Sequence, residues 1–213
     1  MELAKVNRSY SSAEHRADAI LHVAGVLFAI NGGLWLLLHV TGLSVVASVS
    51  VYCVGLFAML TASAAYNLWP HGNTRDWLRR FDHAAIFIMI AATYTPFAVN
   101  RLQQPAGDTI LALIWFGASL GVLLKLLFPR RFEIASLGLY LALGWLIVTV
   151  IRPLSTAMAA LDFWMLVAGG LVYSAGVIFY VAERIPYHKV IWHGFVLLAV
   201  VLHFTAIASE FTG

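Results

Sequence analysis

Long apolar runs fill most of this sequence and constrain its fold more than any other feature. Seven such runs follow one another. Each is roughly 18 to 25 residues long, the length a helix needs to cross about 30 Å of hydrocarbon. They lack the alternating segments of about ten residues that mark the strands of an outer-membrane barrel. With 62% hydrophobic and 11% charged residues, the chain is too apolar for a soluble globule. The sequence therefore predicts an all-α integral membrane protein.

Short connections separate the apolar runs, so one seven-helix bundle is the expected architecture. The predicted spans are residues 17–40, 44–67, 82–99, 109–128, 133–151, 162–181 and 189–208. We expect residues 76–81 to form a short interfacial turn, and Arg152 and Pro153 to end the fifth span. No linker is long enough to separate two folded units. Residues 1–213 are thus predicted to form a single membrane domain, with 1–16 as a cytoplasmic segment without a cleavable signal peptide.

The basic residues predict the orientation of the bundle. Eleven of the 13 Lys and Arg residues fall on one side of the predicted membrane, and only Arg101 and Arg152 fall on the other. Because the basic side of such proteins is cytoplasmic, we expect the N-terminus inside and the C-terminus outside. A plasma (inner) membrane location, with lipids as partners, follows. The net charge of +3 does not indicate binding to nucleic acid. Because Cys53 is the single cysteine, an internal disulfide is excluded. The sequence does not predict the oligomeric state.

Polar residues inside the predicted spans gather near the cytoplasmic ends of four helices. They are Asp18 and His22 in the first span, Ser63 and Asn67 in the second, Asp82 and His83 in the third, and Lys189 and His193 in the seventh. Three of these pairs are spaced i, i+4, which places both members on one helix face. Since an unpaired charge in the membrane is costly, we expect the four faces to surround one polar chamber. His39 and His203, toward the other side, are interpreted as structural or interfacial.

Each polar residue also has a structural interpretation that the sequence leaves open. Asp82 could be an acid favoured by the helix dipole near a helix N-terminus. His22 and His193 could be hydrogen-bonded to neighbouring carbonyls, and Lys189 could extend its amine to the lipid headgroups. Ser63 could bond back to its own helix. None of these alternatives predicts the shared depth of the residues, which favours a common site.

Three sequence stretches resemble the hemolysin III family, the bacterial branch of the progestin and adiponectin receptor superfamily. They are SAAYN at 63–67, FDHAAIFIMIAATYTPF at 81–97 and YHKVIWHGFVLLAVVLHF at 187–204. EHRADAILHVAG at the first span extends the likeness over nearly the whole chain. The resemblance implies seven helices, a cytoplasmic N-terminus and a zinc ion held by an S-x-x-x-H face, an aspartate and an H-x-x-x-H face. It also implies a ceramidase-like amide hydrolase, a lipid or hormone receptor, a regulator of membrane state, or a cytolytic protein.

This sequence keeps only some of the site residues that the family resemblance implies. Ser63 and Asp82 match the family's serine and aspartate, and His193 matches the second histidine of the last helix. Two other metal-binding histidines are replaced, by Asn67 and Lys189. In the first span, the family's asparagine is Asp18 and its histidine is kept as His22. Since neither an amide nor an ammonium is a good zinc ligand, we expect zinc to be absent or weakly bound.

The sequence therefore predicts a protein in which a lysine amine replaces the zinc charge. We expect Lys189 to neutralise Asp82, directly or through water, while Asn67 hydrogen-bonds to Ser63 or His193. A shifted metal site formed by His193, His22 and Asp82, with His83 or His188, is the alternative.

The sequence is compatible with three functions for this chain. A non-catalytic lipid binder that acts in membrane homeostasis is preferred. A metal-dependent lipid amide hydrolase, in which Ser63 and Asp82 orient water or the oxyanion, is the alternative. A cytolytic or pore-forming protein is the third, although the spans show no continuous polar stripe.

Overall fold

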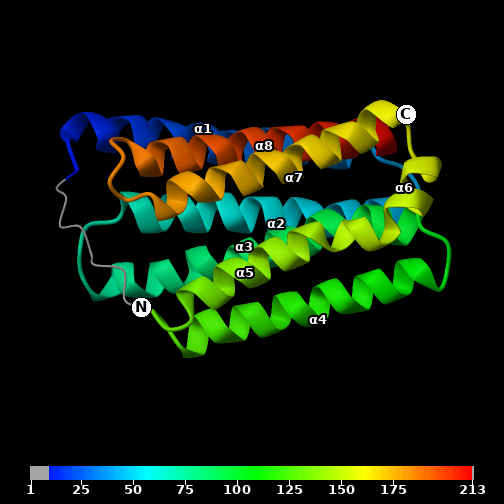
Figure 1. Ribbon diagram of the computed structural model, residues 1–213. Coiled ribbons are helices and arrows are strands. Elements are labelled where there is room, and N and C mark those ends of the chain that lie inside the picture. The colour runs from blue at the N-terminus through cyan, green and yellow to red at the C-terminus, as the bar shows by residue number, and fades with distance from the viewer. Residues whose placement is uncertain (1–9, 213) are drawn as a thin grey trace.

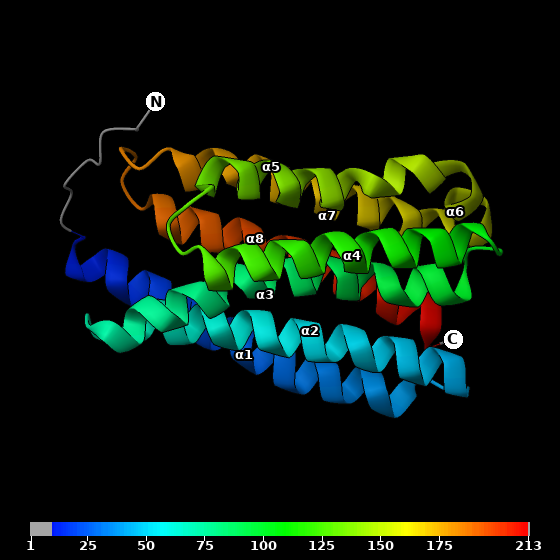
Figure 2. The same cartoon turned by 90° about the horizontal axis from the view of Figure 1, so that it is seen from below.

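The computed structural model describes residues 10–212 as a bundle of long helices lying side by side (Figures 1 and 2). In chain order the elements are α1 (Ser12–His39), α2 (Leu43–Leu68), α3 (Asn73–Asn100), α4 (Ala106–Leu127), α5 (Glu133–Gly144), the 3-10 helix η1 (Trp145–Val150), α6 (Ile151–Ala157), α7 (Ala160–Val181) and α8 (His188–Phe211). Seven helical segments within these residues are long and apolar enough to cross a membrane, with α5, η1 and α6 together forming one of them. The predicted seven-helix membrane fold is confirmed.

The chain enters the bundle through a capped helix. Ser11 accepts a hydrogen bond from the Glu14 backbone N–H at 3.1 Å, and the Glu14 carboxylate accepts the Ser11 N–H at 2.8 Å. This reciprocal arrangement satisfies two backbone donors that the first turn of a helix would leave free. Glu14 also accepts the Tyr187 backbone N–H at 2.8 Å, which ties the start of α1 to the start of α8.

The third helix is longer than the predicted span. Residues 76–81 were expected to form a separate interfacial turn, but α3 is continuous from Asn73 to Asn100. The expectation was wrong because no helix breaker follows Gly72 before the apolar part of the helix begins, so these residues extend the same helix. Asp82 and His83 therefore lie well inside α3 and not at its start.

The fifth span is broken where the sequence predicts a continuous helix. Between α5 and α6 the backbone tightens into η1, and the Tyr94 hydroxyl from α3 fills the break. It lies 2.8 Å from the Gly144 carbonyl oxygen and accepts the Ile147 N–H at 2.8 Å. Arg152 and Pro153 do not end the span as predicted, since α6 continues to Ala157. Proline is tolerated in the first turn of a helix, where its missing N–H has no partner to lose.

Glycines let several helices approach closely. A Cβ atom on Gly121 would collide with the Phe87 ring across α3 and α4, and one on Gly169 would collide with His203 across α7 and α8. These two glycines are positions of close helix packing. Gly170 is different, because a Cβ atom there would meet nothing within 4 Å. The open space beside Gly170 belongs to a cavity.

One end of the bundle carries most of the basic residues. We call it the proximal end; α1, α3, α5 and α8 begin there, and it lies on the left in Figure 1. It holds Arg16, Arg75, Arg79, Arg80, Lys125, Arg130, Arg131, Arg184 and Lys189. Arg101 and Arg152 lie at the opposite, distal end, while Lys5 and Arg8 fall outside the described residues. The distribution expected from the sequence is present, and the assignment of the proximal end to the cytoplasm stays a prediction.

Candidate functional site

A cavity of about 180 Å³ lies inside the bundle and reaches the polar residues of the proximal end. Seven helical segments contribute to its walls: α1, α2, α3, α5, η1, α7 and α8. Its proximal part is lined by His22, Ser63, Asp82, His83 and His193. Each of the four predicted helix faces thus contributes at least one residue to this space, whereas Asp18, Asn67 and Lys189 do not line it. The remaining walls are mainly apolar and aromatic, and a second cavity of about 90 Å³ adjoins them toward the distal end.

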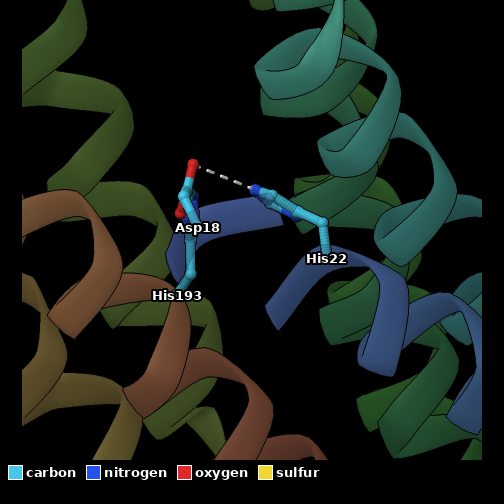
Figure 3. A group of neighbouring side chains, drawn as sticks. All are labelled: Asp18, His22 and His193. Carbon is cyan, nitrogen blue, oxygen red and sulfur yellow. Dashed lines mark hydrogen bonds and ion pairs between the residues drawn. The ribbon is translucent and has the colours of Figure 1, made fainter. Parts of the chain in front are cut away.

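Asp18, His22 and His193 form a compact polar cluster on α1 and α8 (Figure 3). One Asp18 carboxylate oxygen lies 2.5 Å from His193 Nδ1, and the other lies 3.5 Å from His22 Nε2. The two imidazole centroids are 4.4 Å apart. All three side chains are largely buried, with exposed fractions of 13%, 5% and 12% in the order named. We call this group the α1–α8 cluster.

Asp82 and Ser63 lie beside this cluster on α3 and α2. The Ser63 hydroxyl is within hydrogen-bonding reach of the Asp82 carboxylate, and both histidines of the α1–α8 cluster interact with that carboxylate electrostatically. Asn67 donates from its amide to the Ser63 carbonyl oxygen at 3.0 Å and approaches the Ser63 hydroxyl at 3.5 Å. The predicted hydrogen bond between Asn67 and Ser63 is confirmed.

The structure places Lys189 away from Asp82. Its ammonium lies 4.8 Å from the centroid of the Tyr10 ring, a cation–π contact at the proximal surface of α8. Within residues 10–212 no ion pair joins Lys189 to a carboxylate, although Asp18 and Asp82 are near enough to act on its charge. The predicted direct contact between Lys189 and Asp82 is therefore wrong, because an aromatic ring offers the long side chain a partner nearer the surface.

His83 and His188, the other candidates for a shifted metal site, lie outside the α1–α8 cluster. His83 Nδ1 is 3.8 Å from the Glu133 carboxylate. The His188 ring bridges the Tyr10 hydroxyl at 2.8 Å and the Phe179 carbonyl oxygen at 3.2 Å. In the shifted metal site considered from the sequence, the carboxylate was Asp82. In the structure, Asp18 is the carboxylate that contacts both His22 and His193.

An ion-pair network at the start of α5 was not found from the sequence. The Glu133 carboxylate lies 2.7 Å from Lys125 Nζ and 2.9 Å from an Arg79 nitrogen, which joins α3, α4 and α5. The Lys125 side chain is only 4% exposed, although from the sequence it counts only as one of the eleven basic residues that predict the orientation. The sequence did contain a signal for this network, because Glu133 follows the two arginines Arg130 and Arg131. A buried ammonium such as that of Lys125 requires a carboxylate partner, and Glu133 is the acid nearest to it in the sequence.

His203 contributes to the cavity as well as to packing. Its Nε2 lies 3.1 Å from the Leu166 carbonyl oxygen, which confirms the structural interpretation. The same ring lines both cavities, together with Thr93, Tyr94 and Gly170. Thr93, Tyr94 and His203 belong to stretches that carry the family resemblance, but nothing in those stretches predicted that they line a cavity.

The residues at the family's zinc positions do not fit a zinc ion. The amide of Asn67 is engaged with the Ser63 carbonyl, and the ammonium of Lys189 faces Tyr10. Neither side chain provides a suitable ligand atom, so His193 is the only histidine left of the three that the resemblance implies. Any metal at the proximal end must be held by a different set of residues.

The fold and the cavity define a multi-pass helical membrane protein with a polar cluster at one end of an apolar interior. Comparison with known proteins narrows this class. The Haemolysin-III related family matches residues 11–204. The chain therefore belongs to the hemolysin III family.

Individual relatives cover most of the chain. It is 38% identical to hemolysin-3 of Bacillus cereus over 86% of its length and 85% of that protein. It is 35% identical to the hemolysin-3 homolog of Bacillus subtilis, over 88% of its length and 90% of the relative. The human monocyte to macrophage differentiation factor is 28% identical, over 91% of this chain and 83% of that protein, which supports the link to the wider receptor superfamily.

Proposed function

We propose that this chain is a non-catalytic membrane protein that binds a lipid in its interior cavity and has lost the zinc arrangement of its family. The main support for the proposal is that the cavity has a polar end and an apolar remainder. Charged and polar side chains gather at the proximal end, and apolar and aromatic side chains line the rest. A lipid with a polar head and an apolar chain has the same division.

The polar end offers both donors and acceptors to a headgroup. Asp82 supplies a carboxylate, Ser63 a hydroxyl, and His22 and His193 supply ring nitrogens. The apolar walls continue toward Tyr94 and His203, where the second cavity begins. A ligand chain placed along this path would exchange bilayer contacts for protein contacts without exposing itself to water.

The bundle also offers a route from the bilayer. The α5 and α7 helices both line the cavity, but they make few close backbone contacts with each other. A lipid chain could enter between them more easily than between the tightly packed pairs α2–α3 or α7–α8.

A metal-dependent hydrolase of a lipid amide is the second candidate. It is favoured by the α1–α8 cluster, which groups two imidazoles and a carboxylate beside Ser63 and Asp82. In this account Ser63 and Asp82 are the candidate catalytic residues, and His22 and His83 lie beside them in the cavity wall. Asp18, Asn67 and Lys189, the other candidate ligand-binding residues, do not line the cavity and would act on the ligand only through these neighbours. Release of fatty acid from ceramide-like amides by the purified protein would favour this candidate over the non-catalytic binder.

Cytolysis is a third candidate, suggested by the names of the two Bacillus relatives. The distal cavity is lined almost entirely by apolar residues, which does not favour an ion path through the bundle. Dye leakage from liposomes that contain the protein tests this candidate.

We further propose that the whole chain forms one domain in the plasma membrane, with the proximal end in the cytoplasm. The basic residues at that end support this orientation. The cavity's polar end would then lie at the level of the inner leaflet.

Filling the cavity tests the lipid-binding proposal. Gly170 lines the cavity with open space at its Cβ position, so Gly170→Leu is expected to occupy that space without moving the backbone. Gly138→Leu is the matched control, because Gly138 is exposed on α5 and a Cβ atom there also meets nothing within 4 Å. Native mass spectrometry should detect lipid bound to the unmodified protein and to Gly138→Leu, and much less on Gly170→Leu. Equal lipid on all three would contradict the proposal.

A further inference from the structure

A buried nitrogen in the α1–α8 cluster lacks a hydrogen-bond partner. His22 Nε2 is inaccessible to solvent and makes no hydrogen bond, although an Asp18 carboxylate oxygen lies 3.5 Å away. Buried polar atoms in proteins are nearly always satisfied, so such an atom calls for an explanation. A distance of 3.5 Å is long for a hydrogen bond, but it suits two atoms that bind the same ion.

The three side chains of the cluster offer a suitable set of ligand atoms. One ligand atom from each of Asp18, His22 and His193 lies within 4.8 Å of the other two. In a tetrahedral zinc site with bonds of about 2.0–2.2 Å, ligand atoms are roughly 3.3 Å apart. Asp18 Oδ2 lies 3.5 Å from His22 Nε2, which is close to this separation, while the other oxygen, Oδ1, lies 2.5 Å from His193 Nδ1. With both oxygens on the ion, or with one oxygen bound and the Oδ1 contact lengthened by about 1 Å, the three side chains can share one ion.

We propose that Asp18, His22 and His193 bind a divalent transition-metal ion of the zinc type. Two imidazole nitrogens and one carboxylate oxygen favour Zn²⁺ and Co²⁺ over Mg²⁺ and Ca²⁺, which prefer oxygen ligands. His22 and His193 also line the cavity, so an ion held by them would be within reach of a molecule bound there. This inference goes beyond the lipid-binding function and does not depend on it.

The charges around the cluster are compatible with a dication. Asp18 provides one negative charge, and Asp82 interacts electrostatically with both imidazoles. The nearest lysine, Lys189, directs its ammonium to the Tyr10 ring and not into the cluster. Its repulsion of a bound ion is thereby reduced.

The site differs from the arrangement that the family resemblance implies. There, α2 contributes one histidine and α8 contributes two; here the α2 position is Asn67 and the first α8 position is Lys189. At the same time, Asp18 stands on α1 where the family has asparagine. The substitution on α1 creates a ligand close to His22 and His193, while the other two substitutions remove ligands. A metal ion in this chain would therefore be bound nearer to α1, whereas the family arrangement binds it nearer to α2.

Metal titration of the purified protein tests the proposal. After treatment with EDTA, the protein should bind about one Zn²⁺ or Co²⁺ per chain, with the visible absorption of tetrahedral Co²⁺, while Mg²⁺ and Ca²⁺ do not compete. Asp18→Asn and His193→Gln should each weaken binding by about 100-fold or more, because loss of even an outer partner weakens metal sites by about 10- to 100-fold. His39→Gln, which removes an exposed histidine at the distal end, should bind as the unmodified protein does.

X-ray absorption of the zinc-loaded unmodified protein keeps the test independent of variant folding. The proposal predicts a first shell of two imidazoles with oxygen ligands. A first shell with one imidazole or none, no stoichiometric binding, or undiminished binding by folded Asp18→Asn would overturn it. Lipid content is measured separately, so a failure of the lipid-binding proposal leaves this readout unchanged.

Discussion

At the scale of single residues, two positions change the polar end of the cavity. Asn67 and Lys189 occupy places where the resemblance implies zinc-binding histidines, and both side chains have found other partners. Asn67 bonds to the Ser63 carbonyl in its own helix, and Lys189 lies over Tyr10. Asp18 instead contacts His193 across two helices. The sequence identified these residues as a group, but their pairing depends on side-chain directions that helical spacing does not fix.

The Glu133 network supplies a prediction about stability. Glu133→Gln should lower the free energy of unfolding by about 1–3 kcal/mol, because it leaves Lys125 as a buried cation without its carboxylate. This expected loss of stability is smaller than the loss for breaking a fully buried ion pair, because the Glu133 side chain is 34% exposed. Denaturant unfolding in one detergent measures the change.

Asp76→Asn is the control for that measurement. Asp76 pairs with Arg130 at 2.6 Å, but both side chains are more than half exposed. Exposed pairs contribute about 0–1 kcal/mol, so the control should unfold nearly as the unmodified protein does. Equal losses for both variants would show that burial of Lys125 is not the cause.

At the scale of helices, the sequence predicted the number and approximate position of the spans, because apolar length is what the bilayer selects. It did not predict the ends of α3 or the break in the fifth span. Those depend on partners from elsewhere in the chain. The break at Gly144 is stabilised by Tyr94, which lies 50 residues earlier and has no local signature in the fifth span.

Removing that hydroxyl should destabilise the broken span. Tyr94→Phe leaves the Gly144 carbonyl and the Ile147 N–H without this partner in the membrane interior, at an expected cost of about 1–3 kcal/mol. Tyr180→Phe is the control, because within the described part of the chain no hydrogen bond is recorded for its hydroxyl. Unfolding in detergent compares the two, and equal stability of both variants would refute the role of Tyr94.

At the scale of the whole molecule, the basic proximal end predicts how the bundle sits in the membrane. With Cys53 first replaced by alanine, His71→Cys in the α2–α3 connection should react with an impermeant maleimide only after the cells are opened. Gln103→Cys in the α3–α4 connection should react in intact cells. The reverse pattern would invert the orientation and place the polar end of the cavity at the outer leaflet.

The central claim is that α1 and α8 meet through a buried contact between Asp18 and His193 at the proximal end of the cavity. A double-mutant cycle with Asp18→Asn and His193→Gln, in EDTA, measures that contact directly. Because the two groups touch at 2.5 Å and are largely buried, the cycle should give a coupling free energy of about 1–3 kcal/mol. Additive effects of the two substitutions would contradict the account.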